Sequence, residues 1–451
     1  MKQNPLKKNT EIELTIEGIT SEGHGIGRAE GVAVFVPMTA VGERVRVRII
    51  KTEKQYCVGK CMEVLTESEE RVVPPCEAYT LCGGCTMQHL SYFEQLRQKT
   101  LFVQDAFVRI GGFSEAKVED TIGMENPWRY RNKGTFPYRQ ITDAVCFGFY
   151  APRSHRLIPL FDCPIQDERV VRVAQAIAEW ANRCRVSVYD EETKRGILRS
   201  CMARVTQNGT IMAVVVTTGK LPHENELKEH LDFVDSLYHN VNDRDTNVVF
   251  GAQFRLLMGR EQLIEEQGRI RFAVSPQSFL QVNPIQTAVL YDTAVRLLSP
   301  AKEETVLDLY CGIGTISLKL AASAKQVIGI ESVPEAISDA KKNATLNAVD
   351  NAVFYCAKCE ELVPTLVQNG TTVDAILLDP PRKGCEPEVL KAFADSGVER
   401  VVYVSCNPAT LARDASILRT YGFLPVTIQP VDMFPHTHHV ECVVLMSKVQ
   451  K

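Results

Sequence analysis

The sequence predicts an α/β protein in which a doubly wound, mostly parallel sheet follows a small β-barrel and a central β-rich region. Three observations carry this prediction. Short apolar strands alternate with helical stretches from about residue 285 onward, which is the pattern of βαβ units. Residues 9–65 alternate apolar and polar side chains over short runs separated by glycine turns, as in an antiparallel barrel. Strand patterns also dominate residues 126–270, where Asn208-Gly209 is a hairpin-turn signal.

The length and composition indicate a multidomain globular protein. A chain of 451 residues exceeds what one hydrophobic core usually serves, and 45% of its residues are apolar. No run of ~18 uninterrupted apolar residues occurs and the N-terminal stretch is polar and charged, so we expect neither a membrane span nor a signal peptide. We therefore expect a cytoplasmic protein. Its 15 cysteines should then be free thiols, available for metal binding or catalysis.

Changes of pattern along the chain predict three domains. The barrel should span residues 1–66 and end at the charged, proline-containing linker TESEERVVPP. A central, cysteine-containing domain should span residues 67–270, and the α/β domain residues 271–451. Residues 92–110 have helical apolar spacing and end at a glycine pair, so we expect a helix there that could pack on the α/β domain.

Segment 126–160 combines basic and aromatic side chains. It has six cations against a single carboxylate, Asp143, although the whole chain has a net charge of −4. The cations are Arg129, Arg131, Lys133, Arg139, Arg153 and Arg156, interspersed with aromatic rings. Cations beside rings can contact phosphates and stack bases, so the segment is a candidate RNA contact. A solvated sheet face over an aromatic core would show the same pattern, and both interpretations stand.

Three strand ends in the C-terminal part predict a cofactor site. In VLDLYCGIGTISL (306–318), a Gly-x-Gly turn after an apolar strand lets the backbone approach a ligand closely. Glu331 ends the next strand, where a carboxylate can accept both ribose hydroxyls. The turn lacks the third glycine of the dinucleotide fingerprint, and S-adenosylmethionine has no pyrophosphate to bind, so we expect S-adenosylmethionine. In AILLDPPRKG a third strand delivers Asp379 to the pocket, and Arg382, where amine methyltransferases carry a ring, argues against amine methylation.

The stretch VVYVSCNP places Cys406 directly after another apolar strand. A thiolate there, in the cofactor cleft, could add to C6 of a uracil and make its C5 nucleophilic toward a methyl group. A carboxylate must then remove the C5 proton, and Glu441 precedes the last apolar strand. Simpler interpretations remain open, with Cys406 as a buried small hydrophobic residue and Glu441 as a surface carboxylate. Glu441 could also bind a metal with its neighbours His436, His438 and His439.

Five motifs together resemble those of the RNA (uracil-5-)-methyltransferases over nearly the whole chain. They are SPQSFLQVN (275–283), DLYCGIGTISL, LLDPPRKG, SCNP and PHTHHVE. Residues 24–49 resemble the TRAM domain, an OB-like RNA-binding module of RNA-modifying enzymes, although a barrel that serves only as a protein contact is the alternative. The resemblance implies an S-adenosylmethionine-dependent enzyme with a Rossmann-like catalytic domain. It also implies Cys406 as the nucleophile and Glu441 as the base.

Further residues take roles from the same resemblance. The family's cofactor-binding positions correspond to Gln281, Tyr310, Glu331 and Asp379. Phe279 is a candidate for stacking on the target base, with a core phenylalanine as the alternative. Arg382 and Lys383 follow Asp379 closely and could hold the flanking phosphates, with a solvated loop as the alternative.

A cysteine cluster follows the barrel. The stretch CEAYTLCGGC contains Cys76, Cys82 and Cys85, and Cys163 lies far along the chain in FDCP. Three clustered thiols and a distant fourth fit either an iron–sulfur or a zinc site, and spacing does not choose between them. The family resemblance favours a structural [4Fe–4S] cluster, and hence a central β-rich iron–sulfur domain.

Cys406 cannot reach a base inside a helix, so the target uridine must be flipped out or lie in a loop. The TRAM-like barrel and the cysteine cluster resemble the 23S ribosomal RNA branch of the family, and the transfer RNA members usually lack both. We therefore expect a monomeric enzyme, with no membrane partner, that makes 5-methyluridine in 23S rRNA. One alternative is the same chemistry on a tRNA loop, and the other is a non-catalytic RNA-binding or ribosome-assembly protein.

Overall fold

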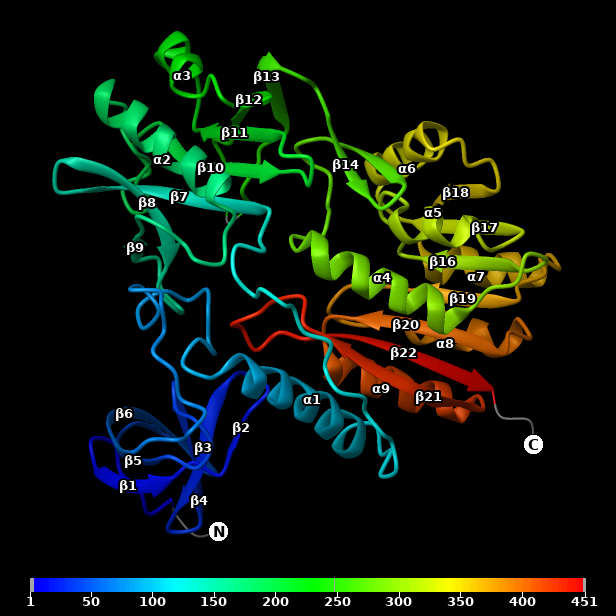
Figure 1. The fold of residues 1–451 in the computed structure, drawn as a ribbon, viewed down its shortest axis with the longest axis horizontal. Helices are drawn as coiled ribbons and strands as arrows, with labels where there is room; N and C mark the ends of the chain where they lie inside the picture. Colours follow the sequence, from blue (N-terminus) through cyan, green and yellow to red (C-terminus); the bar gives the residue numbers. More distant parts are fainter. Residues whose placement is uncertain (1–3, 247, 449–451) are drawn as a thin grey trace.

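The structure is a computed structural model, and it describes residues 4–246 and 248–448. Figure 1 shows an N-terminal barrel, a central sheet and a C-terminal sheet, with helix α1 lying between the barrel and the C-terminal sheet. Among the described residues, no helix is long and apolar enough to cross a membrane.

The N-terminal sheet curls into a small barrel of six strands, in the order β1-β5-β6-β4-β3-β2. Its strands are β1 (Glu11–Thr15), β2 (Gly18–Ile19), β3 (His24–Ala29), β4 (Val32–Pro37), β5 (Arg44–Thr52) and β6 (Tyr56–Thr66). Alternate residues such as Val45, Val47 and Ile49 point into its core, which explains the alternation in the sequence. The expectation of a wholly antiparallel barrel is wrong in one place, because β4 and β6 run parallel.

The central sheet has seven strands in the order β13-β12-β11-β10-β7-β8-β9. They are β7 (Lys133–Ile141), β8 (Ala144–Tyr150), β9 (Leu157–Pro159), β10 (Leu198–Val205), β11 (Ile211–Thr217), β12 (Ser236–Val241) and β13 (Gln253–Gly259). The Asn208-Gly209 turn joins β10 to β11 as predicted, and Gly209 has a φ of 90°. Helices α2 (Glu168–Arg183) and α3 (Glu224–His230) pack on one face of this sheet.

The C-terminal sheet also has seven strands, in the order β18-β17-β16-β19-β20-β22-β21. Five are parallel: β16 (Thr305–Leu309), β17 (Gln326–Glu331), β18 (Ala352–Cys356), β19 (Ala375–Leu378) and β20 (Arg400–Ser405). The last strand, β22 (Glu441–Lys448), inserts antiparallel between β20 and β21 (Phe423–Val431). The alternation of strands and helices therefore predicted the parallel part, but not this insertion.

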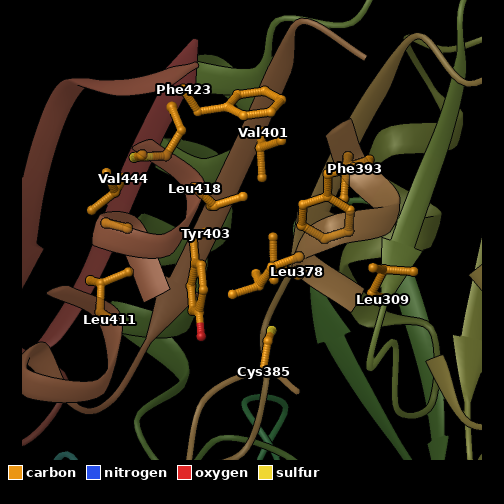
Figure 2. Packing of buried hydrophobic residues seen from close by; sticks show 14 of the residues in the cluster. Leu309, Leu378, Cys385, Phe393, Val401, Tyr403, Leu411, Leu418, Phe423 and Val444 are labelled. Carbon is orange, nitrogen blue, oxygen red and sulfur yellow. The ribbon is translucent and has the colours of Figure 1, made fainter. Parts of the chain in front are cut away.

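Helices cover both faces of the C-terminal sheet. The side that Figure 2 shows packs residues such as Leu309, Leu378 and Tyr403 against α7 (Cys359–Gln368), α8 (Pro387–Asp395) and α9 (Pro408–Thr420). The opposite face packs on α4 (Pro284–Leu298) and α5 (Thr315–Ala321), and α6 (Pro334–Leu346) lies beside β17 and β18. A sheet buried on both faces explains why its strands are almost wholly apolar.

Helix α1 (Tyr92–Arg109) begins at Ser91, whose side chain accepts a hydrogen bond from the Glu94 backbone N–H at 3.1 Å. The expected helix over 92–110 is thus present to within one residue. Val103 and Phe107 belong to the same hydrophobic core as the C-terminal sheet, and α1 contacts α9 and β21. The helix packs on the α/β part of the molecule.

The boundary that we predicted between residues 270 and 271 crosses a hairpin. Strand β14 (Leu263–Gln267) pairs with β15 (Ile270–Val274), so the boundary would separate the first residue of β15 from the rest. Phe272 and Val274 pack with α5 and α6 side chains, whereas Leu263 packs with Met202 and Met212 of the central sheet. The hairpin therefore contacts both sheets, and the division at residues 270 and 271 stays a prediction.

Candidate active site

The loop after β16 has the backbone shape of a ligand-binding turn. Gly312 and Gly314 have φ values of 55° and 83°, and Gly314 begins α5. A Cβ at Gly314 would lie 3.1 Å from the Phe354 ring, so a side chain there would be both strained and crowded. Asp308, in β16, is buried and accepts a hydrogen bond from Ser317 of α5, which ties the strand to the helix across the turn. Burial raises the pKa of Asp308 to about 7.

Glu331 ends β17 with one carboxylate oxygen already oriented. Its Oε1 accepts hydrogen bonds from the backbone N–H groups of Ser332 and Val333, at 2.7 and 2.9 Å. The described residues provide no hydrogen-bond partner for its Oε2, which is free to accept from a ligand hydroxyl. This is the arrangement expected of a ribose-binding carboxylate.

A cavity of about 1000 Å³ opens at the carboxyl ends of the parallel strands, and we call it the main cavity. Its wall contains five of the residues predicted for the site, namely Phe279, Tyr310, Glu331, Asp379 and Lys383. Gln281, also predicted to bind the cofactor, is not part of the wall that the described residues form. Its neighbours Phe279 and Leu280 carry that loop to the cavity instead.

Cys406 and Glu441 are neighbours because of strand register. Ser405, the last residue of β20, pairs with Cys442 of the antiparallel strand β22. The next step along both chains brings Cys406 opposite Glu441 at the same edge of the sheet. Glu441 is only 3% exposed, and Cys406 is half-buried. The structure therefore excludes the interpretation of Glu441 as a surface carboxylate.

The loop that carries Asp379 is joined to the loop that carries Cys406. The Arg382 carbonyl accepts hydrogen bonds from the Asn407 Nδ2 and Thr410 Oγ1 atoms, both at 3.2 Å. Asn407 also begins α9, because its Oδ1 accepts from the Ala409 backbone N–H at 3.1 Å. These contacts hold the Arg382 side chain close enough to act on the Cys406 thiol.

Burial and mutual repulsion raise the pKa values of this group. Desolvation, and then the charge of Asp379, raises the pKa of Glu441 to about 8. Burial also raises the pKa of Asp379. For Cys406, burial and the Glu441 carboxylate raise the pKa to about 11, and the Arg382 guanidinium opposes that rise. Two carboxylates and a thiol in one desolvated place are a candidate catalytic group.

The raised pKa of Glu441 predicts a pH dependence of stability. The folded chain holds the Glu441 proton up to about pH 8, whereas the unfolded chain loses it near the ordinary value of 4.5. Stability from this group is therefore full at low pH and falls as the pH rises toward the folded-state pKa. Glu441→Gln removes this ionisation. As the pH rises from about 5 to about 9, the melting temperature of the variant should therefore increase relative to that of the native chain. Parallel melting profiles of the two proteins would contradict this assignment.

The segment before β22, residues 432–440, is anchored from the N-terminal half of the chain. Lys99 of α1 is fully buried, and its ammonium pairs with Asp432 at 2.5 Å and donates to the Phe434 carbonyl at 3.1 Å. The Tyr92 hydroxyl donates to the other Asp432 oxygen at 2.9 Å. Because this segment leads directly into Glu441, α1 positions the edge that carries Glu441 as well as covering the sheet.

Replacing Lys99 with methionine should destabilise the protein strongly. The variant leaves the Asp432 carboxylate buried without its cation, which typically costs about 3–5 kcal/mol. Thermal and urea unfolding would measure the loss. Arg109→Met is the matched control, because the Arg109–Asp105 pair on the same helix is mostly exposed and should contribute about 0–1 kcal/mol. Equal losses in the two variants would refute the anchoring role of Lys99.

The three histidines near Glu441 have structural contacts. His436 stacks on Trp128 with the ring centroids 3.6 Å apart, and its carbonyl accepts from the Thr86 and Met87 backbone N–H groups at 3.0 Å. Burial lowers the pKa values of His436 and His439 to about 3 and 4 and also lowers that of His438, so all three are neutral at pH 7. In the part of the chain that the structure describes, no three His, Cys, Asp or Glu side chains are placed to hold a metal.

Two of the three predicted substrate residues lie on the rim of the main cavity. Phe279 is 72% exposed, which rules out a core phenylalanine and leaves its ring free to stack. Lys383 is exposed but pairs with Glu386, so its charge is partly compensated. Arg382 is exposed and does not line the main cavity, but it lies close enough to Cys406 for its charge to act on the thiol.

The four predicted cluster cysteines line one further cavity, of about 400 Å³, which we call the cysteine cavity. Cys76, Cys82, Cys85 and Cys163 all contribute to its wall although Cys163 is distant in sequence, but in the described part of the chain no three of them are placed to hold a metal. The Gly84 backbone N–H donates to the Cys82 sulfur at 3.3 Å. Burial raises the pKa of Cys85 to about 12 and that of Cys163 to about 11, so without a cation these thiols keep their protons.

Sequence reasoning missed Tyr291, which borders the main cavity, but it had singled out Arg131 and Lys133, which border the cysteine cavity. Tyr291 of α4 is buried in the wall of the main cavity, but a tyrosine on the apolar face of a helix gives no signal beyond core packing. Arg131 and Lys133 line the cysteine cavity and have no carboxylate partner among the described residues. The density of cations in segment 126–160 was the signal for these two.

The C-terminal sheet is doubly wound, with a glycine turn after β16 and a ribose-type carboxylate at the end of β17. These features define the class of S-adenosylmethionine-dependent methyltransferases. The family model described as tRNA (Uracil-5-)-methyltransferase matches residues 243–449, and the TRAM domain model matches residues 5–62. An uncharacterized RNA methyltransferase of Clostridium tetani is 46% identical over 99% of this chain and 98% of its own length. One from Bacillus cereus (strain ATCC 10987) is 44% identical over 99% and 98%. The chain therefore belongs to the RNA (uracil-5-)-methyltransferase family and carries an N-terminal TRAM domain.

A solved structure agrees with this assignment over almost the whole chain. It is that of the Pyrococcus abyssi tRNA (uracil-54, C5)-methyltransferase in complex with S-adenosyl-L-homocysteine. The TM-score is 0.79 at 27% identity, covering 96% of this chain and 99% of that one. The protein is thus an S-adenosylmethionine-dependent RNA methyltransferase.

Proposed function

We propose that this enzyme methylates C5 of a uridine in 23S rRNA through a covalent bond between Cys406 and C6 of the base. The adjacency of Cys406 and Glu441 across β20 and β22, beside the main cavity, carries this proposal. S-adenosylmethionine would supply the methyl group, held by Tyr310, Glu331 and Asp379 in the cavity wall. The proposed RNA substrate places the enzyme in the cytoplasm, where we expect it to act as a monomer.

The reaction begins with loss of the Cys406 proton. The thiolate then adds to C6, the C5=C6 double bond opens, and its electron pair makes C5 a carbon nucleophile. The Arg382 guanidinium stabilises the thiolate, since its charge lowers the pKa of Cys406 against the effects of burial and Glu441. C5 takes the methyl group, and the base is then saturated at both C5 and C6.

Glu441 completes the reaction as a general base. Its carboxylate removes the remaining C5 proton, the double bond re-forms, and the C6–S bond breaks to release the thiolate. The raised pKa of Glu441 suits this role, because a carboxylate with pKa near 8 is a stronger base than an exposed one. Gln281 contributes through its loop, which presents Phe279 to the target base.

Two classes of RNA compete as the substrate. The motifs and the cysteine cavity support 23S rRNA, by resemblance to the ribosomal branch of the family. The Pyrococcus abyssi structure favours tRNA, because an enzyme described as acting on tRNA matches this chain over the barrel and the cysteine segment as well as the catalytic sheet. Incubating the enzyme with 23S rRNA and with tRNA, each transcribed without modifications, and locating 5-methyluridine by mass spectrometry would decide between them. Methylation of the tRNA alone would overturn the ribosomal assignment.

For the cysteine cavity we propose a [4Fe–4S] cluster bound by Cys76, Cys82, Cys85 and Cys163. Its support is the family resemblance, together with the presence of all four thiols in the wall of one cavity and the N–H group that donates to the Cys82 sulfur. The cluster would supply structural cross-linking, because it joins the segment before α1 to the loop before α2. Protein purified without oxygen should be brown, with absorbance near ~400 nm, whereas a zinc protein would be colourless.

A further inference from the structure

The face of the central sheet away from α2 is covered at β10 and β11 by a second apolar cluster and is partly accessible only at β7. Phe136 and Tyr138 of β7 point toward α2, and the Tyr138 hydroxyl donates to the Ala174 carbonyl in that helix at 3.0 Å. The alternate residues Lys133, Thr135 and Arg139 therefore point to the other face. Lys133 and Arg139 are six residues apart in one strand, so this partly exposed row extends for about 20 Å.

A cavity of about 460 Å³ lies at the far end of this row, and we call it the aromatic cavity. Aromatic residues contribute much of its wall, among them Phe149, Tyr150 and Tyr189. Tyr150 is 37% exposed, unlike most rings of segment 126–160, which are buried in the central core. The aromatic-core interpretation of that segment is thus correct for most of its rings, but Tyr150 is available to a ligand.

Polar side chains hold two of these rings in place. Glu191 accepts a hydrogen bond from the Tyr150 hydroxyl at 3.2 Å, and its other oxygen pairs with His155 at 2.7 Å. The Arg199 guanidinium lies over the Tyr189 ring, 4.5 Å from its centroid. Rings fixed in this way lose little conformational entropy when a planar ligand stacks on them.

The three cavities lie next to one another, because neighbouring cavities share wall residues, and we call this series of cavities the path. Phe279 and Leu280 line both the main cavity and the cysteine cavity. Thr135 and Phe149 line both the cysteine cavity and the aromatic cavity. Between the two ends of the path lie Arg131 and Lys133, the cations without carboxylate partners. The path runs from Asp379 across the β7 face to Tyr150.

We propose that the aromatic cavity binds an unpaired nucleotide of the same RNA whose uridine enters the main cavity. The inference rests on the proposed function. Arg139 and Arg199 in the wall of the aromatic cavity attract the phosphates beside this nucleotide, and its base stacks on Tyr150 or Tyr189. The Glu191 carboxylate can accept a hydrogen bond from an amino group on that base. A duplex could not supply such a base, so this site selects RNA that is single-stranded beside its target.

The test compares two RNAs with two proteins. The short RNA contains the target uridine, replaced by 5-fluorouridine, and its immediate neighbours, and the longer RNA adds single-stranded flanks. The double variant Tyr150→Ala and Tyr189→Ala should bind the longer RNA about tenfold more weakly than the native protein, but the short RNA equally well. The matched control is Tyr355→Ala, an exposed tyrosine on β18 outside all three cavities. It should leave both affinities unchanged.

Cross-linking locates the nucleotide directly and does not depend on any variant. Native protein trapped on the longer RNA, with 4-thiouridine at successive flank positions, should cross-link to a peptide that contains Tyr150 or Tyr189. Equal affinity of native and double-variant protein for the longer RNA, with cross-links elsewhere, would overturn the proposal and favour a protein occupant. The short RNA distinguishes that outcome from a failure of the proposed function. A protein that lacked the covalent chemistry would trap neither the short nor the longer RNA.

Discussion

Cys406→Ser is expected to abolish methyl transfer, with a rate loss of at least about 10⁴-fold, comparable to the loss of a nucleophile in other covalent enzymes. A serine hydroxyl is almost wholly protonated at neutral pH and cannot add to C6 of a pyrimidine at a useful rate. Transfer of a radiolabelled methyl group from S-adenosylmethionine to RNA measures the loss. Binding of S-adenosylhomocysteine by calorimetry should be unchanged, because Cys406 is not in the wall of the main cavity.

Two other cysteines serve as controls for this experiment. Cys311 lies in the cofactor loop and Cys356 is exposed at the end of β18. Cys311→Ala and Cys356→Ser should both still form the covalent complex with RNA that contains 5-fluorouridine, whereas Cys406→Ser should not. Burial raises the pKa of Cys311 far above that of an ordinary thiol, which disfavours it as a nucleophile. A Cys406→Ser protein that methylates RNA at the native rate would refute the covalent mechanism.

The C-terminal sheet was predictable because its signals are local. Each parallel strand is a short apolar run with a helix after it, and the residue that follows such a run must lie at the carboxyl edge. This reasoning places Glu331, Asp379 and Cys406 at the same edge without any structure. The position of Glu441 opposite Cys406 depends on the antiparallel insertion of β22, which is a matter of pairing between distant strands. Only the family resemblance indicated it.

Long-range packing explains the remaining differences. The pairing of Lys99 with Asp432 joins residues 333 positions apart, and nothing near either residue in the sequence identifies its partner. The boundary predicted at residues 270 and 271 falls within a hairpin that contacts both sheets, because alternation predicts a strand but not the sheet on which it packs. The cysteine set was clearer, since thiols free of disulfides were expected to have a chemical role and four of them do share one cavity.

The sequence also could not reveal the long-range packing of segment 126–160. Its composition predicts both an aromatic core and an RNA-binding face, and the structure contains features of each on opposite sides of β7. The period of two residues in a strand separates Phe136 and Tyr138 from Lys133 and Arg139. Knowing which side α2 covers was the missing information, and only the packed structure contains it.

Glu441→Gln is expected to slow turnover by about 10²–10⁴-fold, the usual contribution of a general base, without preventing the first methyl transfer. The amide cannot take the C5 proton, so the C6–S bond cannot break and the enzyme remains attached to methylated RNA. A denaturing gel with RNA that contains ordinary uridine should show this complex, and mass spectrometry should find the added methyl group in it. Glu229→Gln, an exposed residue of α3, should release its product normally.

Because Glu441 lies beside the Cys406 thiol, the same experiment also tests whether Glu441 takes the thiol proton at the start of the reaction. If the carboxylate instead removed the Cys406 proton at the start, Glu441→Gln would block the first methyl transfer and no complex would accumulate. The two possible roles of Glu441 belong to different steps, one before methyl transfer and one after it. The gel distinguishes them, because a methylated complex accumulates only if Glu441 acts after methyl transfer. The raised pKa values of Glu441 and Cys406 mean that each group disfavours ionisation of the other, so the two are not charged together at neutral pH. We therefore expect Glu441 to act after the thiolate has been consumed in the bond to C6, when the repulsion between the two groups has been removed.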